Sequence, residues 1–310
     1  MTGHQTVLLA ATVTLLAPRD GATYVDGTFG GGGLAAALLA AAACRVVGVD
    51  RDRQAIAAGA ALRRRHPDRL ILVEDRFGAM EQVLAGHGIS AVDGIAFDLG
   101  VSSMQIDRAE RGFSFRFDGP LDMRMGDDGT SAEELVNTLP EGRLAEIIQR
   151  YGEERHARRV ARAIVAARPL RRTAELAAIV RNTVPYRGSG PDPATRTFQA
   201  LRMEVNDEMG ELERGLLAAE RLLVPGGRLV VIAFHSLEDR CVKSFLGARS
   251  LPPAVSRHRP AVPQQPPSFR LLTRRALRPG ADEIAGNPRA RSARLRAAER
   301  TAAPAWGNAA

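Results

Sequence analysis

Short apolar runs and amphipathic stretches alternate along the first hundred residues. The apolar runs read as buried strands and are Thr23–Asp26, Arg45–Val49, Leu70–Glu74, Gly94–Leu99 and, much later, Arg228–Phe234. Helical stretches at Leu34–Ala43 and Gln54–Arg65 separate the early runs. Strands that alternate with helices predict a mostly parallel sheet with right-handed crossovers.

The fourth and fifth runs lie about 130 residues apart, whereas a crossover between parallel strands needs a dozen or so. The intervening sequence opens with a turn-rich segment, continues with amphipathic helices and ends in a Gly/Pro-rich breaker. The helices are expected from Ser131, where Ser131–Glu134 reads as a capping box, and at Glu141–Tyr151, Glu153–Arg168 and Thr173–Val184. The pattern predicts an α/β core at 1–104 and 195–310 with an inserted all-helical domain at 105–194.

The sequence after the insert predicts the rest of the core. Apolar residues at three- and four-residue spacing predict one long crossover helix, with Phe198, Leu201, Val205, Met209, Leu212 and Leu216 on one face. A helix is expected at Leu237–Leu246 and a proline-rich loop at Leu251–Pro267. Phe269–Leu277 and Ala293–Arg300 could add two antiparallel strands.

The first predicted strand ends on Asp26 and enters the glycine-rich loop 27–33, and the second ends on Asp50. Glycines allow a backbone to turn sharply and approach a ligand closely, and an acid at the second strand end suits a ribose diol. The glycines do not keep the spacing of a dinucleotide site, and Asp26 would repel a pyrophosphate. A cationic ligand without phosphate fits better, which favours S-adenosylmethionine.

The fourth strand ends on Asp98, in Asp93–Ser103. In a doubly wound sheet this is the crevice where ligands bind, so Asp98 is expected to face both cofactor and substrate. Phe77 follows the third strand, where an aromatic face could stack on a base. A helix-capping role for Asp98 and a core role for Phe77 are the structural alternatives.

Charge is unevenly distributed. The net charge is +8, but residues 241–310 carry +10 and residues 1–240 carry −2. Such asymmetry favours a polyanionic partner, nucleic acid rather than membrane. Lys243 is the only lysine, so richness in arginine as such is weak support for RNA. Two cysteines, no metal-ligand pattern and no apolar run long enough for a bilayer favour a cytoplasmic protein.

Long motifs throughout the chain carry a family resemblance. They are His4–Leu9, Val25–Gly33, Asp98–Ser103, Glu110–Phe115, Asp118–Met125, Tyr151–Arg155, Thr195–Arg202, Pro225–Leu229, Phe234–Arg240 and Asn287–Ser292. The sequence resembles the bacterial small-subunit rRNA cytosine-N4 methyltransferase family, MraW/RsmH. The resemblance implies a Rossmann-like class I methyltransferase core with an inserted helical domain, S-adenosylmethionine as donor, and a decoding-centre cytidine of 16S rRNA in the small ribosomal subunit as substrate.

The resemblance also implies the donor contacts, at Gly32, Gly33, Leu34, Asp50, Phe77, Asp98 and Gln105. The chain departs from the family pattern at Leu34, usually His, and at Ala11, usually Glu. If Leu34 contributes only its backbone N–H, the first departure changes little.

Cytosine N4 is a poor nucleophile, so a group that accepts its hydrogens would favour attack on the donor methyl. Asp98 is the candidate, and His235 at the end of the fifth strand is a second. Phe113, Phe115 or Phe117 could stack on the target base, and Ser102, Ser103 and His235 could contact its edge. RNA phosphates could pair with Arg196, Arg202, Arg240, Arg289 and Arg291, although a solvated basic face is the structural alternative.

Two other functions remain open from the residues alone. A nicotinamide-dependent oxidoreductase would need a loop that accepts phosphate and would leave the basic C-terminal quarter unexplained. An RNA-binding or assembly factor on a methyltransferase fold, without turnover, is supported only by Leu34 and Ala11. Monomer and homodimer are both compatible with the sequence.

Overall fold

The structure is a computed structural model, and it describes residues 6–186, 188, 190–250 and 265–306. The chain forms two compact units: Met1–Gly100 with Gly210–Ala310, and Val101–Met209.

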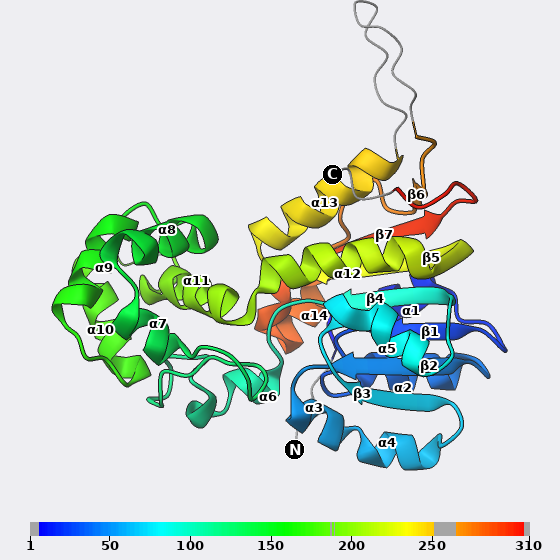
Figure 1. The fold of residues 1–310 in the computed structure, drawn as a ribbon, viewed down its shortest axis with the longest axis horizontal. Coiled ribbons are helices and arrows are strands. Elements are labelled where there is room, and N and C mark those ends of the chain that lie inside the picture. The colour runs from blue at the N-terminus through cyan, green and yellow to red at the C-terminus, as the bar shows by residue number, and fades with distance from the viewer. Residues whose placement is uncertain (1–5, 187, 189, 251–264, 307–310) are drawn as a thin grey trace, which may run out of the picture. The chain divides into compact units, whose positions relative to one another are not determined.

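The first unit is built on a seven-stranded sheet in the order β3-β2-β1-β4-β5-β7-β6 (Figure 1). The strands are β1 (Thr23–Asp26), β2 (Arg45–Asp50), β3 (Leu70–Glu74), β4 (Val92–Asp98), β5 (Leu223–Ala233), β6 (Phe269–Leu271) and β7 (Arg294–Arg300). β1 to β5 are parallel, and β7 is antiparallel to both β5 and β6. The predicted α/β class is therefore confirmed, including the antiparallel C-terminal pair.

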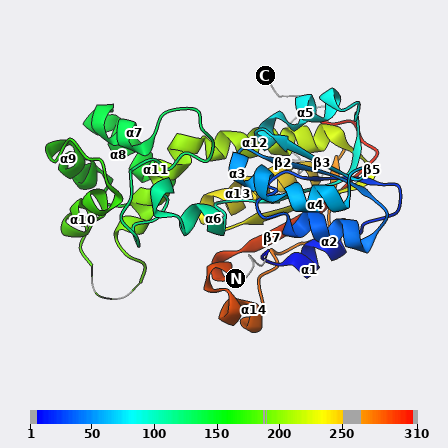
Figure 2. The same ribbon diagram turned by 90° about the horizontal axis from the view of Figure 1, so that it is seen from below.

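Helices cover both faces of this sheet, with α5 and α12 on one side and α1 and α2 on the other (Figure 2). The helices are α1 (Leu9–Leu16), α2 (Gly33–Ala41), α3 (Arg53–Ala58), α4 (Ala60–Arg65), α5 (Met80–Gly86), α12 (Glu208–Leu222), α13 (Ser236–Ser250) and α14 (Ala281–Gly286), with short 3-10 turns η1 (Phe77–Ala79) and η3 (Pro288–Ser292). Because helices cover both faces of the sheet, the central strands β2 and β4 are almost entirely buried. Their sequences are therefore nearly continuous apolar runs. Lys243 is exposed on α13.

The second unit is helical in the elements that the structure describes. They are α6 (Ser103–Ile106), η2 (Ala109–Arg111), α7 (Ala132–Thr138), α8 (Glu141–Gly152), α9 (Ala157–Ala166), α10 (Thr173–Thr183) and α11 (Ala194–Asn206). The predicted capping box is present: Ser131 Oγ accepts from the Glu134 N–H, and Glu134 accepts from the Ser131 N–H. Leu144, Val160, Leu176 and Leu201 lie in a core of the unit's own.

The prediction of one long crossover helix is wrong. The helix is broken at Asp207, whose φ of 49° is left-handed, so α11 and α12 are separate elements. α11 packs on α8, α10 and α7, and Phe198 and Leu201 are buried in the second unit. The compact second unit therefore runs to Met209, beyond the predicted boundary at 194/195.

Smaller differences concern helix and strand ends. The helix expected at Gln54–Arg65 is divided into α3 and α4 at Gly59. A Cβ at Gly59 would lie 2.6 Å from both Phe29 and Leu72, so this position has no room for a side chain. β6 ends at Leu271, although Leu277 still pairs with Leu295 as an isolated bridge. Most of the expected loop Leu251–Pro267 and residues 1–5 lie outside the described residues. Among the described helices, none combines the length and the apolarity that a membrane crossing requires.

Candidate functional site

The glycine loop after β1 is shaped by the buried ring of Phe29. The Phe29 backbone N–H donates to the carbonyl of Val49 at 3.0 Å, which joins the loop to β2. Gly32 has φ +75°, and a Cβ there would lie 2.7 Å from the Phe29 ring. The loop therefore needs glycine at this position for both conformation and space, and it leads directly into α2.

Asp50 at the end of β2 is anchored to the same loop. Its Oδ2 accepts the Gly30 N–H at 2.7 Å, and its Oδ1 accepts the Asp52 N–H at 2.8 Å. Burial raises its pKa to about 6, although these two hydrogen bonds oppose the rise. The carboxylate is therefore fixed in place, and each oxygen retains a lone pair for further hydrogen bonds.

Asp26 and Asp98 end the neighbouring strands β1 and β4. Asp26 is 1% exposed, and its Oδ2 has no hydrogen-bond partner in the described structure. Asp98 Oδ1 is likewise buried without a partner. Burial raises the pKa of Asp26 to about 7, and burial with the nearby charges of Asp26 and Glu238 raises that of Asp98 to about 8. Unsatisfied buried carboxyl oxygens with shifted pKa values make these strand ends a candidate ligand site.

The backbone at these strand ends is also fixed. The Asp98 N–H donates to Thr28 Oγ1 at 2.6 Å, so the loop after β1 is joined to the end of β4. Thr28 was not predicted as a site residue, although it lies inside the Val25–Gly33 motif. Its hydroxyl follows Asp26 by two positions, a spacing that could have suggested a link between neighbouring strand ends.

Phe77 is half-buried in η1, directly after β3. Its ring centroid lies 4.9 Å from that of Phe97 on β4, and a Cβ on Gly215 of α12 would lie 2.6 Å from it. The ring is thus supported from behind by a strand and a helix. The remaining exposure makes it available to a planar ligand.

Leu34 and Ala11, the two departures from the family pattern, both contact the core of the first unit. Leu34 is 5% exposed, and its side chain packs in the core with Leu38 and Phe29. Its backbone N–H lies in the first turn of α2, where N–H groups lack helical partners. Ala11 of α1 is half-buried against the same core. The Leu34 side chain therefore cannot serve as the imidazole would, whereas its N–H can.

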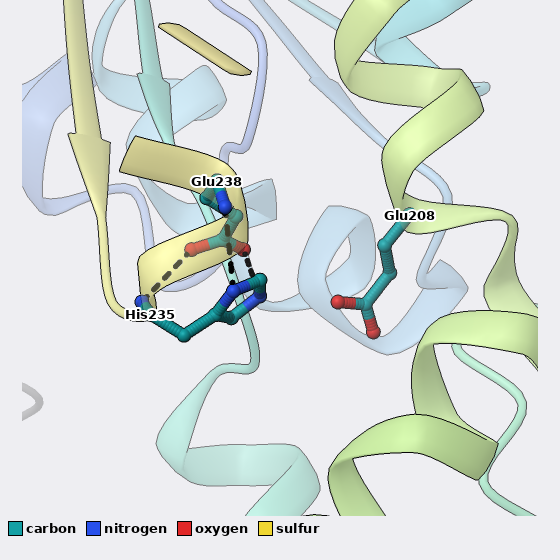
Figure 3. A group of neighbouring side chains, drawn as sticks. All are labelled: Glu208, His235 and Glu238. Atoms are coloured by element: carbon teal, nitrogen blue, oxygen red, sulfur yellow. Dashed lines mark hydrogen bonds and ion pairs between the residues drawn. The ribbon is translucent and has the colours of Figure 1, made fainter. Parts of the chain in front are cut away.

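His235 follows β5 and is paired with Glu238 in the first turn of α13 (Figure 3). The His235 Nε2 and Glu238 Oε1 atoms are 3.1 Å apart, in a geometry that does not make a hydrogen bond. The Phe234 N–H donates to Glu238 Oε2 at 2.8 Å. Glu238 was not predicted as a site residue, although it lies in the Phe234–Arg240 motif three positions after His235. Glu208, also drawn, belongs to the second unit, where it pairs with Arg202.

Other predicted residues belong to the second unit. Gln105 Oε1 accepts the Ser102 N–H at 3.0 Å, which closes a turn at α6. The Ser103 side chain lies outside the described part of the structure. Phe113 is 9% exposed in the core, and Phe115 packs edge-on against Phe198 at 4.9 Å. A base could stack on Phe113 only by displacing its neighbours, whereas the Phe115 ring is half-buried and retains some exposure.

The predicted RNA-contacting arginines differ in their surroundings. Arg202 is nearly buried and makes two hydrogen bonds to Glu208, at 2.7 and 2.9 Å, so its charge is already neutralised. Arg196 is half-exposed with Nη1 3.9 Å from Glu154. Arg240, Arg289 and Arg291 are exposed in the first unit.

A family model described as the MraW methylase family matches residues 1–301. The chain belongs to this family. Membership of this methylase family supports S-adenosylmethionine as the cofactor. The order of the strands agrees with the class I methyltransferase core predicted from the sequence. The match spans both units, including the second unit inserted between β4 and β5.

Two relatives are similar over almost their whole length. A protein named ribosomal RNA small subunit methyltransferase H from Rhodospirillum centenum is 64% identical, over 97% of this chain and 93% of the relative. One of the same name from Paramagnetospirillum magneticum is 60% identical, over 98% and 97%. A solved rRNA methylase from Streptococcus thermophilus aligns with a TM-score of 0.44 and 10% identity, over 97% of this chain and 99% of that chain.

Proposed function

We propose that this protein transfers a methyl group from S-adenosylmethionine to the exocyclic N4 amine of a cytidine in the decoding centre of 16S rRNA. Family membership and the names of relatives at 60–64% identity support methylation of small-subunit rRNA. The observation that carries the chemical step is Asp98, whose Oδ1 is buried without a partner at the end of β4.

The residues present fit the methyl donor. Asp50 is fixed by two backbone N–H groups and can accept hydrogen bonds from a ribose diol. The half-buried Phe77 ring suits an adenine, and the glycine loop with the first N–H groups of α2 suits close approach of the ligand. When bound, the donor supplies an electrophilic methyl group on a sulfonium.

The unpartnered oxygens of Asp26 and Asp98 match the charge of such a ligand. Burial away from water is the main reason that both pKa values are raised, and the nearby charges of Asp26 and Glu238 add to the rise at Asp98. A cation beside them would relieve this cost, whereas a pyrophosphate would increase it. The site thus favours a sulfonium over a nicotinamide dinucleotide.

Asp98 can also act on the substrate. The N4 lone pair of cytosine is delocalised into the ring, so a carboxylate that accepts the N4 hydrogens favours a pyramidal nitrogen. It would also offset the positive charge that grows on nitrogen during transfer. The Glu238 backbone N–H donates to His235 Nδ1 at 3.4 Å, so the ring at the end of β5 would contact the base edge in a fixed orientation.

The exposed arginines of the first unit suit RNA phosphates. Arg289 and Arg291 lie in η3, and Arg240 lies on α13. Arg202 is the least suitable of the predicted contacts, because binding a phosphate would break its paired hydrogen bonds to Glu208.

The test is methyl transfer from labelled S-adenosylmethionine to small ribosomal subunits that lack the modification, with the product nucleoside identified. We expect N4-methylcytidine from the wild type. Asp98→Asn removes the charge at nearly constant volume and should lower the rate on the order of 100-fold or more. Asp68→Asn, at an exposed carboxylate after α4, is the matched control and should be fully active.

Other outcomes would contradict the proposal in distinct ways. A product other than N4-methylcytidine would refute the assigned atom. Donor binding without transfer to any subunit would favour an RNA-binding or assembly factor that lacks turnover. Full activity of Asp98→Asn would remove that carboxylate from the chemical step.

A further inference from the structure

The start of α1 is held by a residue from near the other end of the chain. The Leu8 backbone N–H donates to Glu283 Oε1 of α14 at 2.6 Å, across 275 positions. Leu8 is the residue before α1, and its φ of 51° is left-handed. The N–H groups at a helix start have no helical partner, so this carboxylate satisfies one that is partly buried.

Two residues before Leu8, Thr6 lies against the glycine loop. A Cβ on Gly33 would overlap Thr6 Oγ1, so the Thr6 side chain is seated directly on the first residue of α2. Gly33 must remain glycine for this approach. The short segment Thr6–Leu8 thus joins the loop on one side to Glu283 on the other.

Packing supports the same connection. Val7 and Leu8 are 5% and 8% exposed, and they share one core with Leu34 of α2 and Ala290 of η3. α1, α2 and α14 lie on the same side of the sheet (Figure 2). The hydrogen bond from Leu8 therefore closes a continuous contact from α14 to the glycine loop.

We propose that Glu283 is a positioning residue for the methyl donor: by holding Thr6–Leu8 against Gly33, it keeps the glycine loop in its binding shape. This inference rests on the proposed function, because it takes that loop as the donor site. Glu283 acts through Leu8 and Thr6 and does not itself touch the reacting atoms. Without this hydrogen bond the glycine loop becomes ordered only when the donor binds, and the free-energy cost of that ordering weakens donor affinity. The chemical step is unchanged, because the bound loop has the same shape.

The test compares Glu283→Ala with Glu283→Gln, and with Asp282→Ala as the matched control at the neighbouring exposed acid. S-adenosylhomocysteine binding by calorimetry and the kinetics of methyl transfer are measured. Glu283→Ala should raise the Kd for S-adenosylhomocysteine and the KM for S-adenosylmethionine about tenfold, with kcat at saturation within about twofold. Glu283→Gln should restore wild-type values, because its amide oxygen can accept the same hydrogen bond. Asp282→Ala should match the wild type.

The failures of the two proposals can be told apart. A wild type that binds no S-adenosylhomocysteine refutes the donor site and the proposed function. If the wild type and folded Glu283→Ala bind S-adenosylhomocysteine with the same Kd, this inference is refuted and the proposed function is not. Glu283→Gln behaving like Glu283→Ala would also refute it, since the hydrogen bond would then not be the cause. If Glu283→Ala does not fold, Thr6→Ala breaks the other end of the link and should weaken binding several-fold, and unchanged binding would overturn the inference.

Discussion

At the scale of single residues, three strand-end acids differ in how their oxygens are satisfied. Asp50 accepts two backbone N–H groups, whereas Asp26 and Asp98 each retain a buried oxygen without a partner. Burial penalises the ionised form, so the raised pKa values of Asp26 and Asp98 follow directly from this arrangement. A bound positive charge favours the ionised form and would lower both pKa values again.

Donor affinity should therefore depend on pH. Below the free-state pKa of about 8 for Asp98 and about 7 for Asp26, binding a sulfonium requires release of a proton. Affinity for S-adenosylmethionine should rise with pH, by up to about tenfold per pH unit for each linked group, and level off above about pH 8. Calorimetry between about pH 6 and pH 9 measures this slope.

S-adenosylhomocysteine is the control ligand, because it carries the same amino-acid and ribose groups with a neutral sulfur. Its affinity should change much less over the same range. Parallel pH profiles for the two ligands would mean that the acids do not sense the sulfonium. In Asp98→Asn the slope for S-adenosylmethionine should become shallower.

The strand-end acids could be predicted from sequence because each closes an apolar run, and parallel strands bring their carboxyl ends to one edge of the sheet. The surroundings of Phe113 and Arg202 could not be predicted from the sequence. Phe113 stands in a turn-rich polar segment, but it is buried by helices that follow it in sequence. Arg202 meets Glu208 only because the chain turns at Asp207. Both depend on tertiary contacts that no local pattern records.

At the scale of elements, α12 determines where Phe77 can lie. Gly215 faces the Phe77 ring, and its missing side chain provides the room. Gly215→Ala should push the ring from its place on Phe97 and weaken S-adenosylhomocysteine binding about tenfold, since stacking on a base is worth on the order of 1–3 kcal/mol. Calorimetry of the purified variant measures the loss.

Gly247→Ala is the matched control within the same unit. Gly247 lies in α13 with nothing near its Cβ position, so alanine should stabilise the helix by about 0.5–1 kcal/mol and leave binding unchanged. Wild-type affinity in Gly215→Ala would show that the position of Phe77 does not matter for the donor.

Element type was predicted more reliably than element continuity. The apolar spacing from Phe198 to Leu216 continues across Asp207, so periodicity alone predicted one helix. Asp207 adopts a left-handed conformation there and ends α11. Phe198 and Leu201 are buried in the core of the second unit, whereas Leu212 and Leu216 are buried outside that core. The boundary between α3 and α4 at Gly59 was also not predicted. Phe29 and Leu72 fill the space that a side chain at Gly59 would occupy, and the local sequence does not record such tertiary contacts.

At the scale of the whole molecule, the two units have separate cores. Leu144 is fully buried in the core of the second unit and Leu38 in that of the first. Leu144→Ala should destabilise the second unit by about 2–5 kcal/mol and leave S-adenosylhomocysteine affinity unchanged where both units are folded. Differential scanning calorimetry and binding calorimetry check the two parts of this prediction.

Leu38→Ala is the counterpart in the first unit. It should lower stability by a similar amount and also weaken donor binding, because Leu38 supports α2 behind the glycine loop. Equal loss of donor affinity in Leu144→Ala would mean that the two cores unfold as one and would contradict the separation.

The single lysine gives this chain an unusual vulnerability to one reagent. A lysine-specific protease can cleave only after Lys243, within α13, and so produces just two fragments. The side chain is exposed, but its neighbour Val242 and nearby Leu246 are buried, so the backbone must leave the helix before it enters a protease cleft. One cut, read as one pair of bands on a gel, would therefore report how often the first unit opens, and a ligand that binds only the closed form should slow its appearance.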